Sequence, residues 1–184
     1  MVSSRNMIKA LVLVFVLFAS VCALPFIVPS TWDYNAVIRD AARLYGINED
    51  EFNVTFINKP ILNAATGEES VGLWHFDIDN RANGIHNIQI QKSISRPMAI
   101  ATIFHEFAHA AQYKYKLQHP NYTTEQHAEL MAFNTMWNSK YWWNATHMLT
   151  MHTIKLKPAE YRVTNELWNC AMTGTNVMGF RPLA

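Results

Sequence analysis

This sequence has few cysteines and almost no net charge. Only Cys22 and Cys170 occur in 184 residues, and the formal net charge is +1. The near-neutral balance argues against a nucleic-acid-binding protein, which normally carries a basic stripe. Repeats, heptads and low-complexity tracts are also missing, which excludes solenoids and coiled coils. Half of the residues are hydrophobic and only 16% are charged, so the chain can build a sizeable core.

The first thirty residues have a different composition from the rest. Arg5 and Lys9 precede an apolar run at 10–21, and small residues follow up to Ala23. A basic start, a short apolar centre and a small-residue end predict a secretory signal peptide, residues 1–23, cut after Ala23. The alternative is an uncleaved membrane anchor at 10–29, although prolines interrupt the second half of that segment.

Residues 24–184 are expected to form a single domain. Removal of residues 1–23 takes away two of the 15 basic residues, which leaves 13 against 14 acidic residues and a net charge of −1. Cys170 is then the last cysteine, so the domain has no internal disulfide and depends on its core. Three N-x-T sequons, at Asn53, Asn121 and Asn144, are close to the number expected by chance and do not predict glycosylation.

The first half of this domain has one helical and three strand-like patterns. Helical spacing predicts a helix over 34–45, capped by Thr31 or Asp33 and ended by Gly46. Alternating apolar residues predict three strands, at 52–57, 71–79 and 85–91. We expect them to form a short antiparallel sheet with one apolar face.

The second half is mostly helical. Ser95 and Pro97 mark the start of a helix that the pattern extends to residue 116. Thr123 and Gln126 resemble a capping box that opens a helix to about residue 140. A later helix is expected over 158–172. The fold class is therefore α+β, with a short sheet packed on the helix 98–116 and further helices after it.

The sequence IFHEFAHAAQ, residues 103–112, places three ionisable side chains in an apolar segment. On a helix, His105 and His109 project from one face, at a spacing that lets two imidazole nitrogens reach one Zn²⁺ ion. Glu106 projects beside such an ion and can act as the general base toward a water molecule. Three unpaired ionisable groups in this environment would cost several kcal/mol, which favours a metal site.

A catalytic zinc needs a third protein ligand and one open position. A third histidine of the metzincin type is excluded because Gln112 and Tyr115 occupy the places of the glycine and histidine in that pattern. A cysteine ligand upstream of the helix is excluded because no cysteine lies between Cys22 and His105. An antiparallel helix that starts near Thr123 brings Glu129 nearly level with His109, so Glu129 is the first choice. The alternatives that stay open are Glu125, Glu166, His119 and His127.

These residues resemble the gluzincin branch of the zincin metallopeptidases, over about residues 85–138. The resemblance implies a zincin-like fold, one catalytic Zn²⁺ with His105, His109 and Glu129 as ligands, and Glu106 as the catalytic base. An acidic residue often follows the ligand glutamate by one turn in this family and supports a motif histidine. Phe133 occupies that place here, which is a departure from the pattern.

The resemblance also implies peptide-bond hydrolysis. An oxyanion-stabilising group is then needed, and the downstream candidates are His147, His152, Tyr161 and Arg162. The strand at 85–91 could bind an extended peptide by strand addition.

The sequence thus predicts a secreted or secretory-pathway zinc metallopeptidase, monomeric, with a peptide or protein as substrate. A nucleic-acid partner is not expected, and a membrane is expected only if residues 1–23 stay attached. Two other interpretations remain: a zinc-binding domain without catalysis, and a metal-free exported binding protein in which the HExxH sequence is accidental.

Overall fold

The computed structural model describes residues 34–62, 67, 69–78, 84–154, 165–167 and 169, all within one compact unit, Asp33–Ala184. It begins with helix α2 (Asn35–Tyr45), whose apolar face is buried. Gly46 ends the helix in the left-handed conformation, at φ 66°, as the sequence predicts. The expected caps, Thr31 and Asp33, lie outside the described residues, as does the segment 1–23, so the signal peptide stays a prediction.

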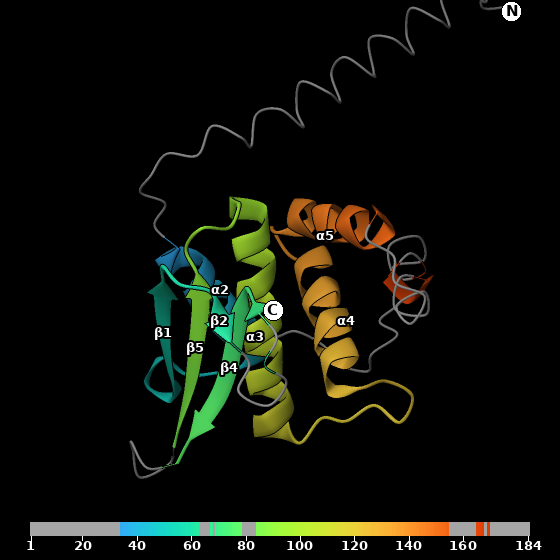
Figure 1. Ribbon diagram of the computed structural model, residues 1–184. Helices are drawn as coiled ribbons and strands as arrows, with labels where there is room; N and C mark the ends of the chain where they lie inside the picture. The colour runs from blue at the N-terminus through green and yellow to red at the C-terminus, as the bar shows by residue number, and fades with distance from the viewer. Residues whose placement is uncertain are drawn as a thin grey trace, which may run out of the picture. The chain divides into compact units, whose positions relative to one another are not determined.

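A three-stranded sheet follows α2 in the chain (Figure 1). Its strands are β1 (Phe52–Ile57), β4 (Gly72–Asp77) and β5 (Ile85–Gln91), in the spatial order β1-β5-β4. Two short strands, β2 (Ile61–Leu62) and β3 (Glu69–Ser70), form a separate antiparallel ribbon.

The prediction of an antiparallel sheet is wrong, because the sheet is mixed. β5 runs antiparallel to β4 but parallel to β1. The residue pattern places side chains on faces but does not encode strand direction, and β5 enters between β1 and β4 rather than beside β4 alone. The predicted strand addition on β5 is wrong for the same reason, since both of its edges are occupied.

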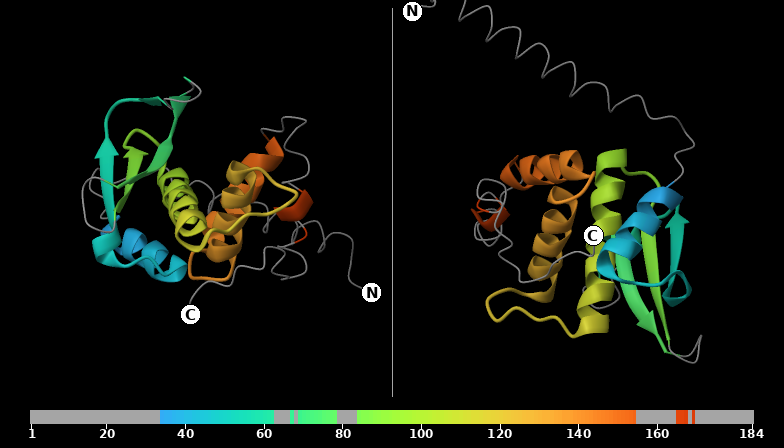
Figure 2. Two further views of the ribbon diagram at one scale, coloured as in Figure 1. Left: turned by 90° about the horizontal axis from the view of Figure 1, so that it is seen from below. Right: turned by 180° about the vertical axis from the view of Figure 1, so that it is seen from behind.

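Helices cover one face of the sheet (Figure 2), and the side chains of the other face are mostly polar. Ile88 and Ile90 of β5 point into the core, where they meet helix α3 (Arg96–Tyr115). On β1 the alternate residues divide in the same way, with Val54 against the core and Thr55 exposed. The single apolar face that the alternation predicts is therefore present.

Helix α3 is the centre of the unit, and most of its residues are buried. Helix α4 (Thr124–Trp137) returns beside it and opens with the predicted capping box, in which Thr123 Oγ1 accepts from the Gln126 N–H. Helix α5 (Trp142–Ile154) crosses the end of this pair (Figure 1).

Two sequence-based predictions differ from the structure in this half. Helix α4 ends at Trp137 instead of residue 140, and α5 was not expected at all. Of the helix predicted over 158–172, residues 165–167 and 169 are described and are helical, with Leu167 fully buried in the core. None of the helices in the described residues is both long and apolar enough to cross a membrane.

Candidate metal centre

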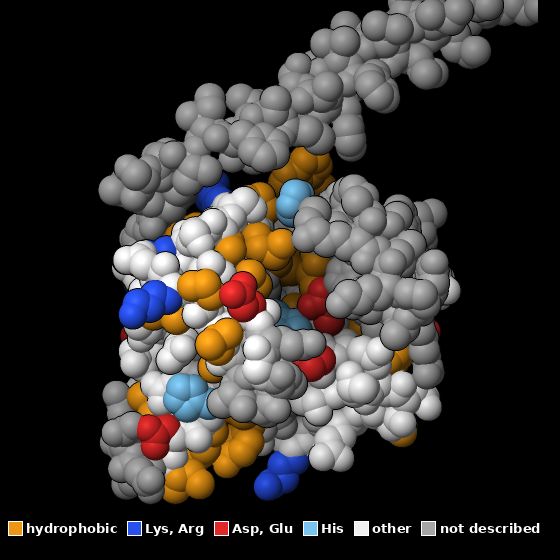
Figure 3. Space-filling view, viewed as in Figure 1, with side chains coloured by type: hydrophobic (Ala, Val, Ile, Leu, Met, Phe, Trp, Pro, Cys, Tyr) orange, Lys and Arg blue, Asp and Glu red, His pale blue; other side chains and the backbone are white. Residues whose placement is uncertain are grey.

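Helix α3 carries the three ionisable residues of the HEFAH sequence on its buried side. Glu106 is 5% exposed and His109 is 7% exposed, while His105 is partly exposed. Both imidazoles turn toward α4, as their spacing of four residues predicts. Figure 3 shows histidine and acidic side chains gathered in a hollow of the surface over α3 and α4.

Three side-chain atoms meet in this hollow. The Nε2 atoms of His105 and His109 are 3.1 Å apart. Glu125 Oε2 lies 3.2 Å from the first and 3.3 Å from the second. The ligand–ligand separation in a tetrahedral site is about 1.63 times the metal–ligand bond, so this triangle fits bonds of about 2.0 Å, the length typical of Zn–N and Zn–O. The group His105, His109 and Glu125 could therefore hold a metal ion.

The other nitrogen of each histidine is already engaged. His105 Nδ1 lies 2.8 Å from Glu129 Oε2, and His109 Nδ1 lies 2.9 Å from Gln112 Oε1. The Gln112 amide in turn donates to the Thr124 carbonyl, at 3.1 Å. Partners of this kind on Nδ1 fix the tautomer and leave Nε2 available as a metal ligand. Both rings are thus held with their ligating atoms toward the same point.

Glu129, the first choice from the sequence, is near the site but on the far nitrogen of His105. The carboxylate that reaches both Nε2 atoms is Glu125, one turn earlier, which was an open alternative. The bond from Gln112 to Thr124 explains the offset of one turn. It shows that α4 begins level with Gln112, one turn before the end of α3, whereas the sequence estimate assumed a start level with the end of α3.

The charges of the site compensate one another. Burial lowers the pKa of His105, but hydrogen bonds to Glu125 and Glu129 outweigh it and raise this pKa well above the usual range. The same contacts with His105 and His109 hold the pKa of Glu125 far below its usual value. A protonated His105 thus supplies positive charge between the carboxylates. Burial raises the pKa of Glu106, as suits a general base.

Strand β4 forms the opposite wall, and this was not predicted. A Cβ atom placed on Gly72 would lie 2.5 Å from Glu106 Oε1 and would also clash with the Thr102 side chain. Two residues on, the Trp74 ring stacks on His109, with ring centroids 6.0 Å apart and planes inclined by 22°. The alternation puts Trp74 on the inner face of the sheet, but nothing in the sequence reveals which helix residue it meets.

The remaining candidates are not part of this group. His119 and His127 lie near each other at the start of α4, with ring centroids 5.8 Å apart. Glu166 is half-buried and His147 lies on α5. None of these four joins the metal-binding group found in the described residues. Tyr161, Arg162 and the side chain of His152 lie outside them.

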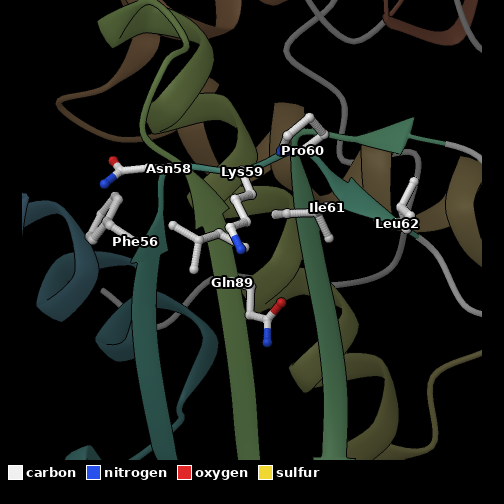
Figure 4. A pocket seen from close by; sticks show the side chains of 8 residues that line it. Phe56, Asn58, Lys59, Pro60, Ile61, Leu62 and Gln89 are labelled. Carbon is white, nitrogen blue, oxygen red and sulfur yellow. The ribbon is translucent and has the colours of Figure 1, made fainter.

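A second hollow lies beyond the end of β1 (Figure 4). It measures about 510 Å³ and is lined by the segment 56–62 and by Gln89 on β5. Its one charged side chain is Lys59, and none of the predicted site residues borders it. The clustered ionisable groups at α3 and α4 are therefore the better candidate for chemistry.

Comparisons with protein-family models, with curated proteins and with solved structures find no match to this chain.

Proposed function

We propose that this protein is a zinc-dependent metallopeptidase with a zincin-like domain. The observation that carries the proposal is the triangle of His105 Nε2, His109 Nε2 and Glu125 Oε2, whose edges of 3.1–3.3 Å fit a tetrahedral zinc ion. Three ligands from protein side chains leave one position open, which is typical of catalytic rather than structural zinc.

The choice of Glu125 as third ligand also removes the departure from the gluzincin pattern. If Glu129 were the ligand, Phe133 would occupy the place of the supporting acid. With Glu125 as the ligand, Glu129 follows it by one turn and contacts His105 Nδ1 at 2.8 Å. The pair Glu125 and Glu129 thus divides the two roles, ligand and support, in the manner that the resemblance implies.

A zinc ion held there supplies a Lewis acid for a carbonyl oxygen and makes a water molecule more acidic. Glu106 lies beside the ligands, is buried and has a raised pKa, so it is placed to accept a proton from water. Hydrolysis adds the hydroxyl to the scissile carbonyl carbon, and Glu106 returns the proton to the leaving nitrogen.

The substrate backbone is proposed to bind along β4 instead of β5. The Gln91 N–H donates to the Val71 carbonyl, so odd-numbered residues of β4 bond to β5 and even-numbered ones face outward. Of these, Trp74 offers its backbone groups at the outer edge, where no strand pairs among the described residues, while the Gly72 N–H and carbonyl both contact the Ser70 hydroxyl. An extended peptide added there would pass beside Glu106.

Metal analysis combined with two substitutions tests the proposal. Purified protein should contain close to one zinc per chain, and His105→Ala should lose it. Glu106→Gln should keep the zinc but hydrolyse peptides at least about 100-fold more slowly, as expected for loss of a general base.

Each other outcome points to one of the alternatives. Zinc without turnover in the wild-type protein would indicate a non-catalytic zinc-binding domain. Absence of bound zinc would indicate an exported binding protein with an accidental HExxH sequence. Export itself stays a proposal that rests on residues 1–23 and is checked by the N-terminal residue of the secreted protein.

A further inference from the structure

Trp74 is held in place by a buried histidine that the proposed chemistry does not use. The indole N–H of Trp74 donates to His86 Nδ1, at 3.1 Å. His86 is buried, and this burial lowers its pKa to about 4, so at neutral pH the ring is uncharged and Nδ1 can accept. An indole N–H that is partly removed from water, as here, needs such a partner.

Two further aromatic rings, those of Phe76 and Tyr113, pack around the pair of Trp74 and His86. The Tyr113 ring contacts Trp74, with centroids 5.7 Å apart, and the Phe76 ring contacts His86, with centroids 4.9 Å apart. Phe76 and Tyr113 also contact one another. Strand β4 supplies Trp74 and Phe76, β5 supplies His86, and α3 supplies Tyr113. The indole plane is therefore held by contacts from two other elements, β5 and α3, where it faces His109.

His109 needs a restraint that its hydrogen bond does not give. The contact between Nδ1 and Gln112 fixes the tautomer and one point of the ring, but the ring can still tilt about that point. The face of Trp74, nearly parallel to the imidazole at 22°, blocks that tilt. Both imidazoles have a partner on Nδ1 and share one edge-to-face contact at 81°, so the stacked face of Trp74 is what His109 has in addition.

We propose that Trp74, locked by its hydrogen bond to His86, is a positioning residue that holds His109 in its metal-binding orientation. The inference rests on the proposed function, because it concerns a ligand of the proposed zinc site. It adds a residue from the sheet to a site whose ligands all come from helices. Because Trp74 contacts the ring face and not Nε2, it acts on metal binding through His109 alone.

Metal affinity and metal geometry test this role. The purified protein is stripped of metal and titrated with Co²⁺ alone, and Zn²⁺ affinity is measured by competition with a chelator. Trp74→Leu should raise the Zn²⁺ dissociation constant about 10-fold, within the range found for residues that orient a ligand, and should change the Co²⁺ absorption spectrum. Phe76→Leu is the matched control, since the ring contacts of Phe76 are with His86 and Tyr113 rather than with Trp74 or His109, and it should leave both unchanged.

Substitutions of His86 test the lock without touching the stacked pair. His86→Phe keeps an aromatic ring but removes the acceptor, so it should weaken zinc binding in the same direction as Trp74→Leu. His86→Asn returns an acceptor near the position of Nδ1 and should recover most of the affinity. This rescue would not occur if His86 only filled space.

The failure of the inference differs from the failure of the proposed function. Wild-type protein that binds neither Co²⁺ nor Zn²⁺ would overturn both. If the wild type binds metal and Trp74→Leu binds it with the same affinity and spectrum, the positioning role is overturned and the zinc site stands. If Trp74→Leu does not fold, the same result in His86→Phe has the same meaning.

Discussion

Two glutamates one turn apart on α4 divide the two nitrogens of His105 between them. Glu125 lies on the Nε2 side, where His109 also points, and Glu129 lies on the Nδ1 side. The side chain of Glu125 is 74% exposed, whereas that of Glu129 is 21% exposed. An accessible carboxylate suits a ligand at the open mouth of a site, and a half-buried one suits a fixed orienting partner.

The two glutamates should therefore respond differently to the same substitution. Glu125→Gln replaces a charged ligand and should raise the Zn²⁺ dissociation constant by more than about 100-fold, while Glu129→Gln keeps an acceptor for His105 Nδ1 and should raise it about 10-fold. Chelator competition measures both. The reverse ranking would return the ligand role to Glu129, as the sequence alone favoured.

The sequence reveals the local part of the site but not its long-range part. His105 and His109 are four residues apart on one helix, so their common direction follows from helix geometry alone. The choice between Glu125 and Glu129 depends on how far α4 is shifted along α3. The connection between the helices sets that shift, and the residue pattern does not encode it.

Strand β4 brings the sheet into the site at two places, Gly72 against Glu106 and Trp74 against His109. These residues are two apart, so they share the face of the strand that turns toward α3. A side chain at position 72 would occupy the volume of the Glu106 carboxylate. The missing side chain is therefore what lets the strand lie this close to the proposed base.

Gly72→Ala should impair turnover while leaving the metal ligands intact. The added methyl group would lie 2.5 Å from Glu106 Oε1 and would displace it, so kcat should fall at least about 10-fold with zinc still bound. Overpacking should also lower the free energy of unfolding by about 1–3 kcal/mol. Peptidase assays and urea unfolding measure the two effects.

A second substitution separates these effects. Thr102→Ser removes the methyl group that the new Cβ would also strike, and the serine hydroxyl can keep the bond to the Met98 carbonyl. The double variant should recover part of the stability but none of the turnover. If turnover recovers together with stability, Gly72 serves packing and not the placement of Glu106.

The elements themselves were predictable to different degrees. Alternation gave the bounds of β1 and β5 as the structure has them, because side-chain faces follow from local sequence. Pairing direction is a property of the whole sheet, and there the prediction was wrong. Helices α4 and α5 both lack a single apolar stripe; the capping box of Thr123 and Gln126 revealed α4, and nothing comparable marked α5.

At the scale of the whole molecule, the site joins helices α3 and α4 with strand β4. The candidate ligands come from two helices, and the walls come from the sheet and the first turn of α4. A metal ion bound between these elements links them only in the folded state. Binding of the proposed ion would therefore be coupled to folding, and the ion should stabilise the fold by an amount that rises with the logarithm of its affinity.

Removal of zinc should lower thermal stability, and the loss should depend on pH. At a free zinc concentration 100 times the dissociation constant, the ion contributes about 2.7 kcal/mol, or roughly 5–10 °C in Tm for a domain of this size. The metal must displace a proton from His105, whose pKa is raised well above its usual value in the metal-free site. The difference in Tm between zinc-loaded and chelator-treated protein should therefore be large at pH 8 and shrink as the pH falls toward 6. His105→Ala, which lacks the ligand, should show no such difference at any pH, and an equal difference in the variant and the wild type would place the stabilising ion elsewhere in the chain.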